Sequence, residues 1–262
     1  MLQRRDMLAG LSAALAAGWL PQALGAVPKL GLIFPPLGRG APEEGLALYG
    51  DKVTFLAEGL GLETMTPEGY EAVIDRIPPT AERLVAAGAE AVVLMGTSLS
   101  FFKGEAYNQQ LTAALRAATG GRLPVTTMST AVIEGLKAMG ASKVAAPTAY
   151  NDEVNQRLRH FLGEHGFDVV ALRGLGVEAV EDINLVTQPQ LLEFCVDVVK
   201  SAASADAILV SCGGLRTLEI LAPLEDRTGR PAVSSTPHAL YAAAKLVGLD
   251  PRVAGYGRLI GS

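Results

Sequence analysis

The segment ADAILVSCGGL (205–215) decides the fold, because it joins a short apolar run to a turn of small residues. The run AILV predicts a buried strand, and the two glycines after Cys212 indicate a tight turn. A second segment, AEAVVLMGTSL (89–99), has the same order: an acid in second place, an apolar run, a small-residue turn and a leucine. In this alignment Gly96 is the counterpart of Cys212.

Two further pairs of segments repeat in the same way. KLGLIFPP (29–36) matches SKVAAPT (142–148), and PVTTMSTAV (124–132) matches PAVSSTPHAL (231–240). Strand patterns alternate with helical patterns, and this alternation predicts parallel sheets in a doubly wound α/β fold. We therefore expect two similar α/β domains, 27–140 and 141–237, related by a pseudo-twofold axis around a cleft. The C-terminal segment, from about 238 to 262, is expected to pack on the first domain.

The first 26 residues have a different character. They contain the pair Arg4-Arg5, an apolar stretch of roughly a dozen residues, too short to span a bilayer, and a small-residue end near Ala26. This pattern predicts a twin-arginine export signal, a transient partnership with the export machinery and a periplasmic location. An amphipathic N-terminal helix is the alternative.

Composition excludes several classes of protein. The 262 residues carry a net charge of −5 with no basic cluster beyond the N-terminus, which disfavours nucleic acid as a partner. Three scattered histidines and the lack of C-x-x-C or H-E-x-x-H predict no metal site. An oxidising compartment would allow a disulfide between Cys195 and Cys212. The helical pattern of QLLEFCVDVVKSA (190–202) favours a buried small residue at Cys195 instead.

Polar residues follow several predicted strands, where ligands of parallel sheets gather. Cys212 could be a reactive thiol or a packed one, and the N–H groups of Gly213 and its neighbour can face an anion. The hydroxyls of Thr97 and Ser98 could hold a carboxylate or cap a helix. Tyr150 could donate from its phenol, or be a partly buried tyrosine with a wet tip. The residues alone leave these alternatives open.

Apolar residues near these turns could form the wall of a pocket. The pair Pro35-Pro36 shapes the turn after the first predicted strand. The other candidates are Leu62, Met65, Tyr70, Val177 and Val180. Judged by pattern alone, ordinary core packing is the favoured interpretation of these residues.

Seven motifs together resemble the arylmalonate decarboxylase family of the aspartate/glutamate racemase superfamily. They are FPPLG, GLGLETMTPEGY, LMGTSLSFF, TTMSTAV, TAYNDEVN, LVSCGGL and GYGRL, in this order over most of the chain. The resemblance implies two similar α/β domains around a cleft and cofactor-free decarboxylation of an α-aryl malonate, a small dicarboxylate. It implies that Cys212 donates a proton, while Thr97, Ser98, Tyr150 and the Gly213 N–H hold a carboxylate. It assigns the apolar pocket to Pro35, Leu62, Met65, Tyr70, Val177 and Val180.

Racemases of this superfamily use one cysteine from each domain, so Gly96 in place of a first cysteine disfavours racemase or maleate-isomerase chemistry. A product of a single handedness is therefore expected. Arg216, Met65 and Phe102 depart from the family pattern, which leaves the natural substrate open. A periplasmic solute-binding protein for small carboxylates is the rival from another class, and either a monomer or a small homo-oligomer is compatible with the sequence.

Overall fold

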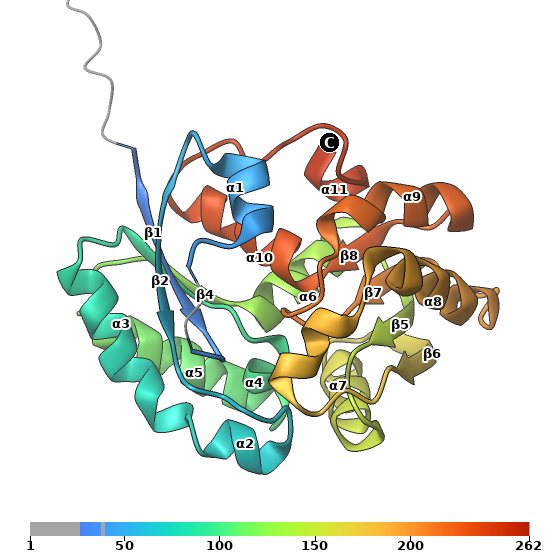
Figure 1. The fold of residues 1–262 in the computed structure, drawn as a ribbon, viewed down its shortest axis with the longest axis horizontal. Helices are drawn as coiled ribbons and strands as arrows, with labels where there is room; N and C mark the ends of the chain where they lie inside the picture. Colours follow the sequence, from blue (N-terminus) through green and yellow to red (C-terminus); the bar gives the residue numbers. More distant parts are fainter. Residues whose placement is uncertain (1–26, 38–39, 262) are drawn as a thin grey trace, which may run out of the picture.

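The computed structural model describes residues 27–37 and 40–261, so the predicted export signal lies outside the described residues. The described strands form two parallel four-stranded sheets (Figure 1). The first has the order β2 (Thr54–Gly59), β1 (Lys29–Phe34), β3 (Ala91–Leu94), β4 (Val125–Thr127). The second has the order β6 (Asp168–Gly174), β5 (Lys143–Thr148), β7 (Ala207–Val210), β8 (Ala232–Ser234). The α/β fold with parallel sheets is confirmed.

The central strands are the apolar runs that the sequence singles out. All four residues of β3 and of β7 are buried, as expected for strands with a neighbour on each side and helices on both faces. The sequence missed β2, TFLAEG, because this edge strand is only partly buried and places Glu58 among its apolar residues. Its counterpart β6 is the strand predicted at DVVAL.

The two sheets have the same topology, which confirms the internal repeat as a pseudo-twofold relationship. The correspondence extends to single hydrogen bonds beyond the strands. The Leu62 N–H donates to the Pro35 carbonyl at 2.8 Å, and the Val177 N–H donates to the Ala149 carbonyl at 2.8 Å. Leu62 and Val177 are therefore equivalent positions in the two halves.

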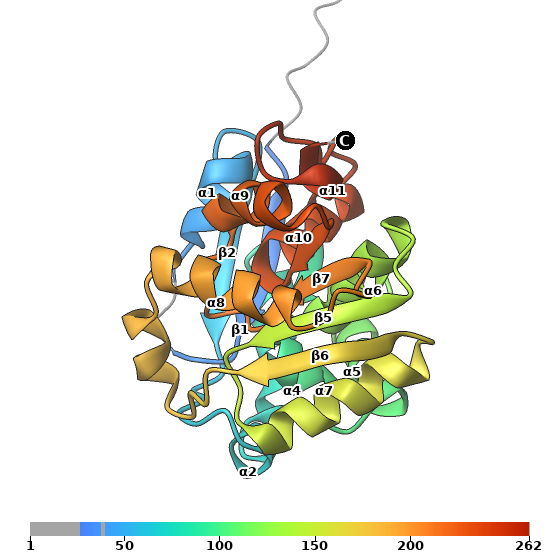
Figure 2. The ribbon, with the colours of Figure 1, turned by 90° about the vertical axis from the view of Figure 1, so that its right-hand side faces the viewer.

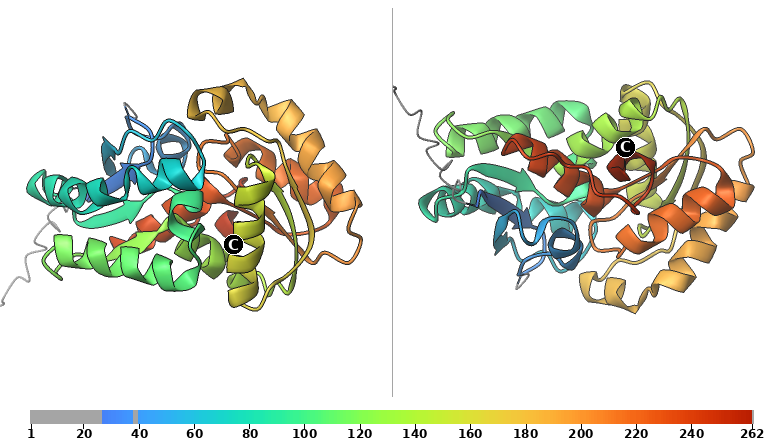
Figure 3. Two further views of the ribbon diagram at one scale, coloured as in Figure 1. Left: turned by 90° about the horizontal axis from the view of Figure 1, so that it is seen from below. Right: turned by 90° about the horizontal axis from the view of Figure 1, so that it is seen from above.

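Helices cover both faces of each sheet, and two of them cross between the halves. Helix α6 (Met128–Ala138) follows β4 but also contacts β7 and β8, whereas α10 (Ser235–Leu246) follows β8 but also contacts β3 and β4. Figure 3 shows α10, in red, reaching from the yellow and orange half into the blue and green half. Residues far apart in the chain thus meet along the pseudo-twofold axis.

The remaining helices form the outer layers. In the first half they are α1 (Glu43–Tyr49), α2 (Pro67–Glu71), η1 (Ile74–Arg76), α3 (Ile77–Ala86), α4 (Thr97–Phe101) and α5 (Glu105–Ala118). In the second half they are α7 (Asp152–Glu164), η2 (Val180–Leu185), α8 (Gln188–Lys200), α9 (Leu218–Thr228) and α11 (Arg258–Gly261). Figure 2 shows α8 lying across β7 and β5, with α7 alongside β6. None of the helices in the described part of the chain is both long enough and apolar enough to cross a membrane.

Candidate active site

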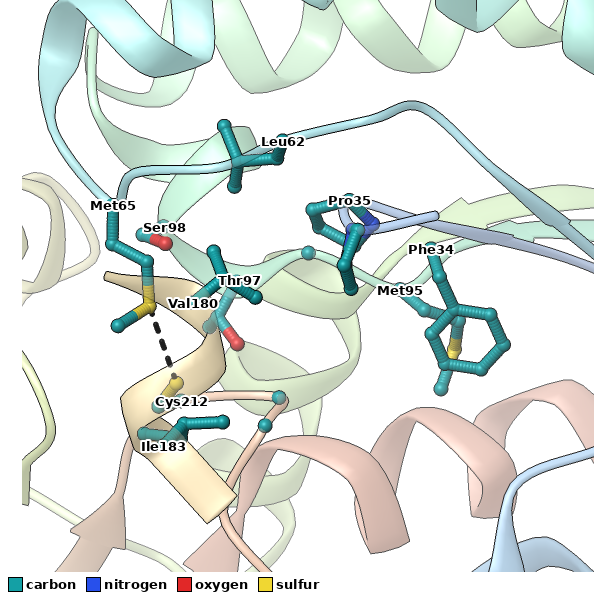
Figure 4. Close-up of a pocket in the computed structure, with 14 residues that line it drawn as sticks. Phe34, Pro35, Leu62, Met65, Met95, Thr97, Ser98, Val180, Ile183 and Cys212 are labelled. Atoms are coloured by element: carbon teal, nitrogen blue, oxygen red, sulfur yellow. Dashed lines mark hydrogen bonds between the residues drawn. The ribbon is translucent and has the colours of Figure 1, made fainter. Parts of the chain in front are cut away.

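A small pocket with a cavity volume of about 40 Å³, partly open to solvent, lies where β1, β3 and β7 end (Figure 4). Its lining consists of Phe34, Pro35, Pro36, Leu62, Met65, Met95, Gly96, Thr97, Ser98, Val180, Ile183, Cys212, Gly213 and Gly214. None of these fourteen residues is charged, so the pocket is an apolar chamber with a few hydroxyl, thiol and backbone groups.

Most of the residues predicted for the site line this pocket, and three do not. Val177, the equivalent of Leu62, is partly buried against the core and lies outside the lining. The prediction that Val177 forms part of the pocket wall is therefore not confirmed. Tyr70 and Tyr150 are almost completely buried behind the lining, so the wet tip suggested for Tyr150 is wrong.

Cys212 lies two residues beyond β7, after Ser211 has paired with Thr148 in a single parallel bridge. Its side chain is 5% exposed, and its Sγ lies 3.9 Å from the Met65 Sδ (Figure 4). Neither this cysteine nor Cys195 forms a disulfide. Cys195 is fully buried in α8, and burial raises the pKa of its thiol to about 12. Of the two thiols, only that of Cys212 faces the pocket.

The turn after Cys212 packs closely against neighbouring side chains. A Cβ atom on Gly213 would lie 3.1 Å from the Met128 Sδ, and one on Gly214 would lie 3.0 Å from the Ile183 side chain. A side chain at either position would require Met128 or Ile183 to move by a few tenths of an ångström. The Thr236 hydroxyl donates to the Gly213 carbonyl at 2.9 Å, and this hydrogen bond connects the turn to α10.

Thr97 and Ser98 are the first two residues of α4, and the N-cap position is Gly96. The helix has no side-chain cap, so the capping role proposed as an alternative for these hydroxyls is not observed. The Thr97 Oγ1 lies 2.8 Å from the Ser235 Oγ and 2.9 Å from the Met128 Sδ. The Thr97 hydroxyl thus stands at the meeting point of α4, α6 and α10.

Two buried phenols adjoin these groups. The Tyr150 Oη lies 3.2 Å from the Ser211 Oγ. Burial raises the pKa of Tyr150, nearby Cys212 raises it further, and the hydroxyls of Ser211 and Thr97 oppose the shift. Burial likewise raises the pKa of Tyr70, with the Ser98 hydroxyl opposing it. Both phenols are therefore protonated near neutral pH and can act as hydrogen-bond donors.

Two equivalent segments close the pocket across the pseudo-twofold axis. The Met65 N–H donates to the Glu178 carbonyl at 2.7 Å, and the Val180 N–H donates to the Glu63 carbonyl at 2.9 Å. Between them, Thr64 and Ala179 form an antiparallel bridge. This reciprocal pair holds the apolar side chains of Met65 and Val180 over Cys212.

Sequence reasoning missed several residues of the site. Met95 and Ile183 line the pocket, and Met128 and Ser235 contact Thr97. The sequence did contain a signal for Met128 and Ser235. The matched segments at 124–132 and 231–240 each contain the end of a strand and the start of a helix, and these two residues lie at that junction. Within the described part of the chain, no group of three or more His, Cys, Asp or Glu side chains is arranged to hold a metal ion.

Comparison with known proteins identifies the closely similar sequences and structures. The family model for arylmalonate decarboxylase matches residues 30–260. The arylmalonate decarboxylase of Bordetella bronchiseptica is 47% identical over 233 residues, covering 88% of this chain and 96% of that protein. A maleate isomerase of Nocardia farcinica is 24% identical, covering 89% of this chain and 96% of that protein.

Solved structures give the same relationship. A liganded arylmalonate decarboxylase, in which one glycine is replaced by cysteine and one cysteine by serine, superposes with a TM-score of 0.86 at 46% identity, covering 89% of this chain and 99% of that one. The maleate isomerase of Pseudomonas putida S16 has a TM-score of 0.83 at 21% identity, over 90% of this chain and 99% of that one, and shares the fold. With the family model matched along nearly all of the described chain, this protein belongs to the arylmalonate decarboxylase family of carbon–carbon lyases.

Proposed function

We propose that the protein decarboxylates α-aryl, α-substituted malonates without a cofactor, and that Cys212 protonates the resulting enediolate on one face. The observation that carries this proposal is the placement of one thiol in an uncharged pocket next to hydroxyl and backbone donors. Family membership supports a decarboxylase, and the uncharged lining supports a substrate with an aromatic or alkyl group beside its carboxylates.

The two ends of the pocket suit the two carboxylates of such a substrate. One carboxylate would be held by the hydroxyls of Thr97 and Ser98 and the Gly213 N–H, with the phenol of Tyr150, behind the lining and next to Thr97, as a further donor. The other would face the apolar side chains that close the pocket, where loss of hydration raises its energy relative to neutral carbon dioxide. Decarboxylation relieves that desolvation, so the apolar wall favours departure of this carboxylate in particular.

The bond between Cα and the departing carboxylate then breaks, and its electron pair remains on Cα. The pair delocalises into the retained carboxylate to form a planar enediolate, whose oxygens gain negative charge. Neutral donors already in place around those oxygens stabilise the charge as it develops. The Cys212 thiol transfers its proton to Cα, and the thiolate is reprotonated from solvent. The sum is one dicarboxylate and one proton converted to one monocarboxylate and carbon dioxide.

The product should have one handedness, because only one face of the enediolate meets an acid. The equivalent position across the axis is Gly96, which has no side chain that could donate a proton. This asymmetry also argues against racemisation or isomerisation, since both need a group that removes or adds a proton, or attacks, from the opposite side.

The test is to incubate the purified protein with phenylmalonate and with methyl(phenyl)malonate, and to follow carbon dioxide release and the enantiomeric composition of the product. Cys212→Ser should lower turnover by about a thousandfold or more, while thermal melting and binding of phenylacetate are preserved. Cys195→Ser is the matched control, since that thiol lies away from the pocket in α8 and its variant should keep turnover.

Three outcomes would contradict the proposal. Binding of arylmalonates without carbon dioxide release by the wild type would favour the solute-binding alternative. Conversion of maleate would favour the isomerase alternative. Full activity in Cys212→Ser would show that another group delivers the proton.

A further inference from the structure

Three consecutive hydroxyl residues at the junction of β8 and α10 bond to the segment 212–217, which follows β7 and begins with Cys212. They are Ser234, Ser235 and Thr236, all buried. Their partners are, in order, the Thr217 hydroxyl at 3.0 Å, the Cys212 N–H at 3.1 Å and the Gly213 carbonyl at 2.9 Å. The backbone of Cys212 and Gly213 is therefore held by two side chains of α10, those of Ser235 and Thr236.

Ser235 differs from its two neighbours because its hydroxyl contacts both halves of the molecule. The Cys212 N–H of the second half donates to the Ser235 Oγ, and the Thr97 hydroxyl of the first half donates to the same oxygen at 2.8 Å. Ser235 is 0% exposed, so solvent does not reach its hydroxyl. One buried oxygen thus connects the thiol-bearing turn to a hydroxyl that lines the pocket.

The equivalent position in the first half is Met128, which follows β4 as Ser235 follows β8. Its Sδ lies 2.9 Å from the same Thr97 Oγ1. The Thr97 hydroxyl therefore stands between two equivalent positions, one occupied by a thioether and one by a hydroxyl. A thioether accepts hydrogen bonds weakly and has no proton to donate, so of these two side chains only Ser235 can donate to Thr97.

The number of available protons reverses the direction of the bond between Thr97 and Ser235 when a carboxylate is bound. Thr97 has one hydroxyl proton, and donating it to the carboxylate leaves its oxygen free to accept. Ser235 also has one proton, and the Cys212 N–H already occupies one of its lone pairs. The result is a chain of bonds from the Cys212 N–H through Ser235 and Thr97 to the carboxylate, in which each bond polarises the next.

We propose that Ser235 is a positioning residue that strengthens the hydrogen bond from Thr97 to the substrate carboxylate by donating to the Thr97 oxygen. The inference rests on the proposed function, because it takes Thr97 to hold that carboxylate. The contribution grows as negative charge develops on the enediolate, so it affects kcat more than KM. The asymmetry between Gly96 and Cys212 is thereby accompanied by a second one, between Met128 and Ser235.

A double-mutant cycle tests the inference, using Ser235→Ala and Thr97→Val in the full-length protein with methyl(phenyl)malonate as substrate. Ser235→Ala should lower kcat about tenfold with KM changed less than about threefold. In the Thr97→Val background the same change should lower kcat by less than about twofold, because Ser235 then has no hydroxyl to act through. Equal losses in the two backgrounds would overturn the proposal.

Ser234→Ala is the matched control, because it deletes the adjacent buried hydroxyl, which is bonded to Thr217 and not to Thr97. Its effect on kcat should be the same with and without Thr97→Val. If Ser235→Ala does not fold, Ser235→Cys keeps the volume with a weak donor and should show the same coupling to Thr97→Val. Additive losses for that variant would also overturn the proposal.

Binding separates this inference from the proposed function. If the wild type does not decarboxylate arylmalonates, the proposed function fails, and the cycle is repeated on the dissociation constant of phenylacetate by calorimetry. A Ser235→Ala effect that is several-fold in the wild type and absent in Thr97→Val would still support the chain of bonds. Additivity there, or no binding of phenylacetate at all, would refute it.

Discussion

Gly96 and Cys212 face one pocket from equivalent positions, each two residues beyond the end of a central strand, β3 and β7 respectively. The two halves of the molecule share a topology, yet only one of them presents a thiol at this point. A fold with internal symmetry thus surrounds an asymmetric site. This relationship makes the first half the natural place to introduce a second acid.

Under the proposed mechanism, replacement of Gly96 by cysteine should add slow racemisation of the product. The new thiol would face the opposite side of the enediolate from Cys212, so protons could be removed on one face and added on the other. Incubation of one enantiomer of an α-aryl propionate, with chiral chromatography over time, measures the effect. Unchanged enantiomeric excess in a folded, decarboxylating variant would contradict the equivalent geometry of the two positions.

The structure also predicts that Gly96→Cys makes the protein less stable. A Cβ atom on Gly96 would lie 2.7 Å from the Pro35 Cγ and 3.1 Å from the Leu99 Cβ. Such crowding requires a shift of Pro35 and should lower the free energy of unfolding by about 1–3 kcal/mol. Adding Pro35→Ala removes the Cγ atom and should recover part of this loss, as measured by urea denaturation. No recovery would indicate that the crowding is relieved elsewhere.

A hydroxyl placed in the apolar wall should slow decarboxylation without unfolding the protein. Val180→Thr has nearly the same shape as the wild type and brings a hydration site next to the departing carboxylate, so kcat should fall about threefold to tenfold. Val177→Thr is the matched control, because Val177 lies outside the pocket lining. The two variants are compared by carbon dioxide release at saturating substrate. Similar losses in both would argue against desolvation by this wall.

The repeated segments made the fold predictable, because each pair begins with a buried strand and ends in a turn. The edge strand β2 could not be found in this way, since partial exposure removes the apolar run that marks the buried strands. For the site, the segments just after the strands contained the lining residues Gly96, Thr97 and Cys212. The carboxyl ends of parallel strands lie at the same edge of a sheet, so residues that directly follow the strands can be expected to lie together.

Other parts of the site depend on contacts that no local pattern reveals. Of the equivalent residues Leu62 and Val177, only Leu62 lines the pocket. The contact of Met128 and Ser235 with Thr97 depends on the crossing of α6 and α10 between the halves. Both features arise from packing between distant segments, and single-sequence periodicity does not record them.

A partly buried carboxylate also joins the two halves at the edge of the site. The Glu44 Oε1 in α1 accepts the N–H groups of Thr217 and Leu218 at 2.6 and 2.7 Å, where α9 begins. Burial raises the pKa of Glu44 to about 7, and these hydrogen bonds and the charge of Arg216 oppose the shift. The carboxyl group can therefore be protonated near neutral pH while Oε1 still accepts both bonds.

Because the pKa of Glu44 is raised, the free energy of unfolding should depend on pH. Between about pH 4.5 and 7 the folded chain keeps a proton on Glu44 that the unfolded chain has released, so the free energy of unfolding falls as pH rises through this window. Glu44→Gln keeps the acceptor oxygen but stays neutral, so it should match the wild type near pH 4.5 and exceed its stability by about 1–2 kcal/mol at pH 8. Urea midpoints at the two pH values measure this difference, with the exposed Glu68→Gln as the control. A Glu44→Gln variant that is equally destabilised at both pH values would show that the carboxylate, and not its protonated form, holds α9 in place.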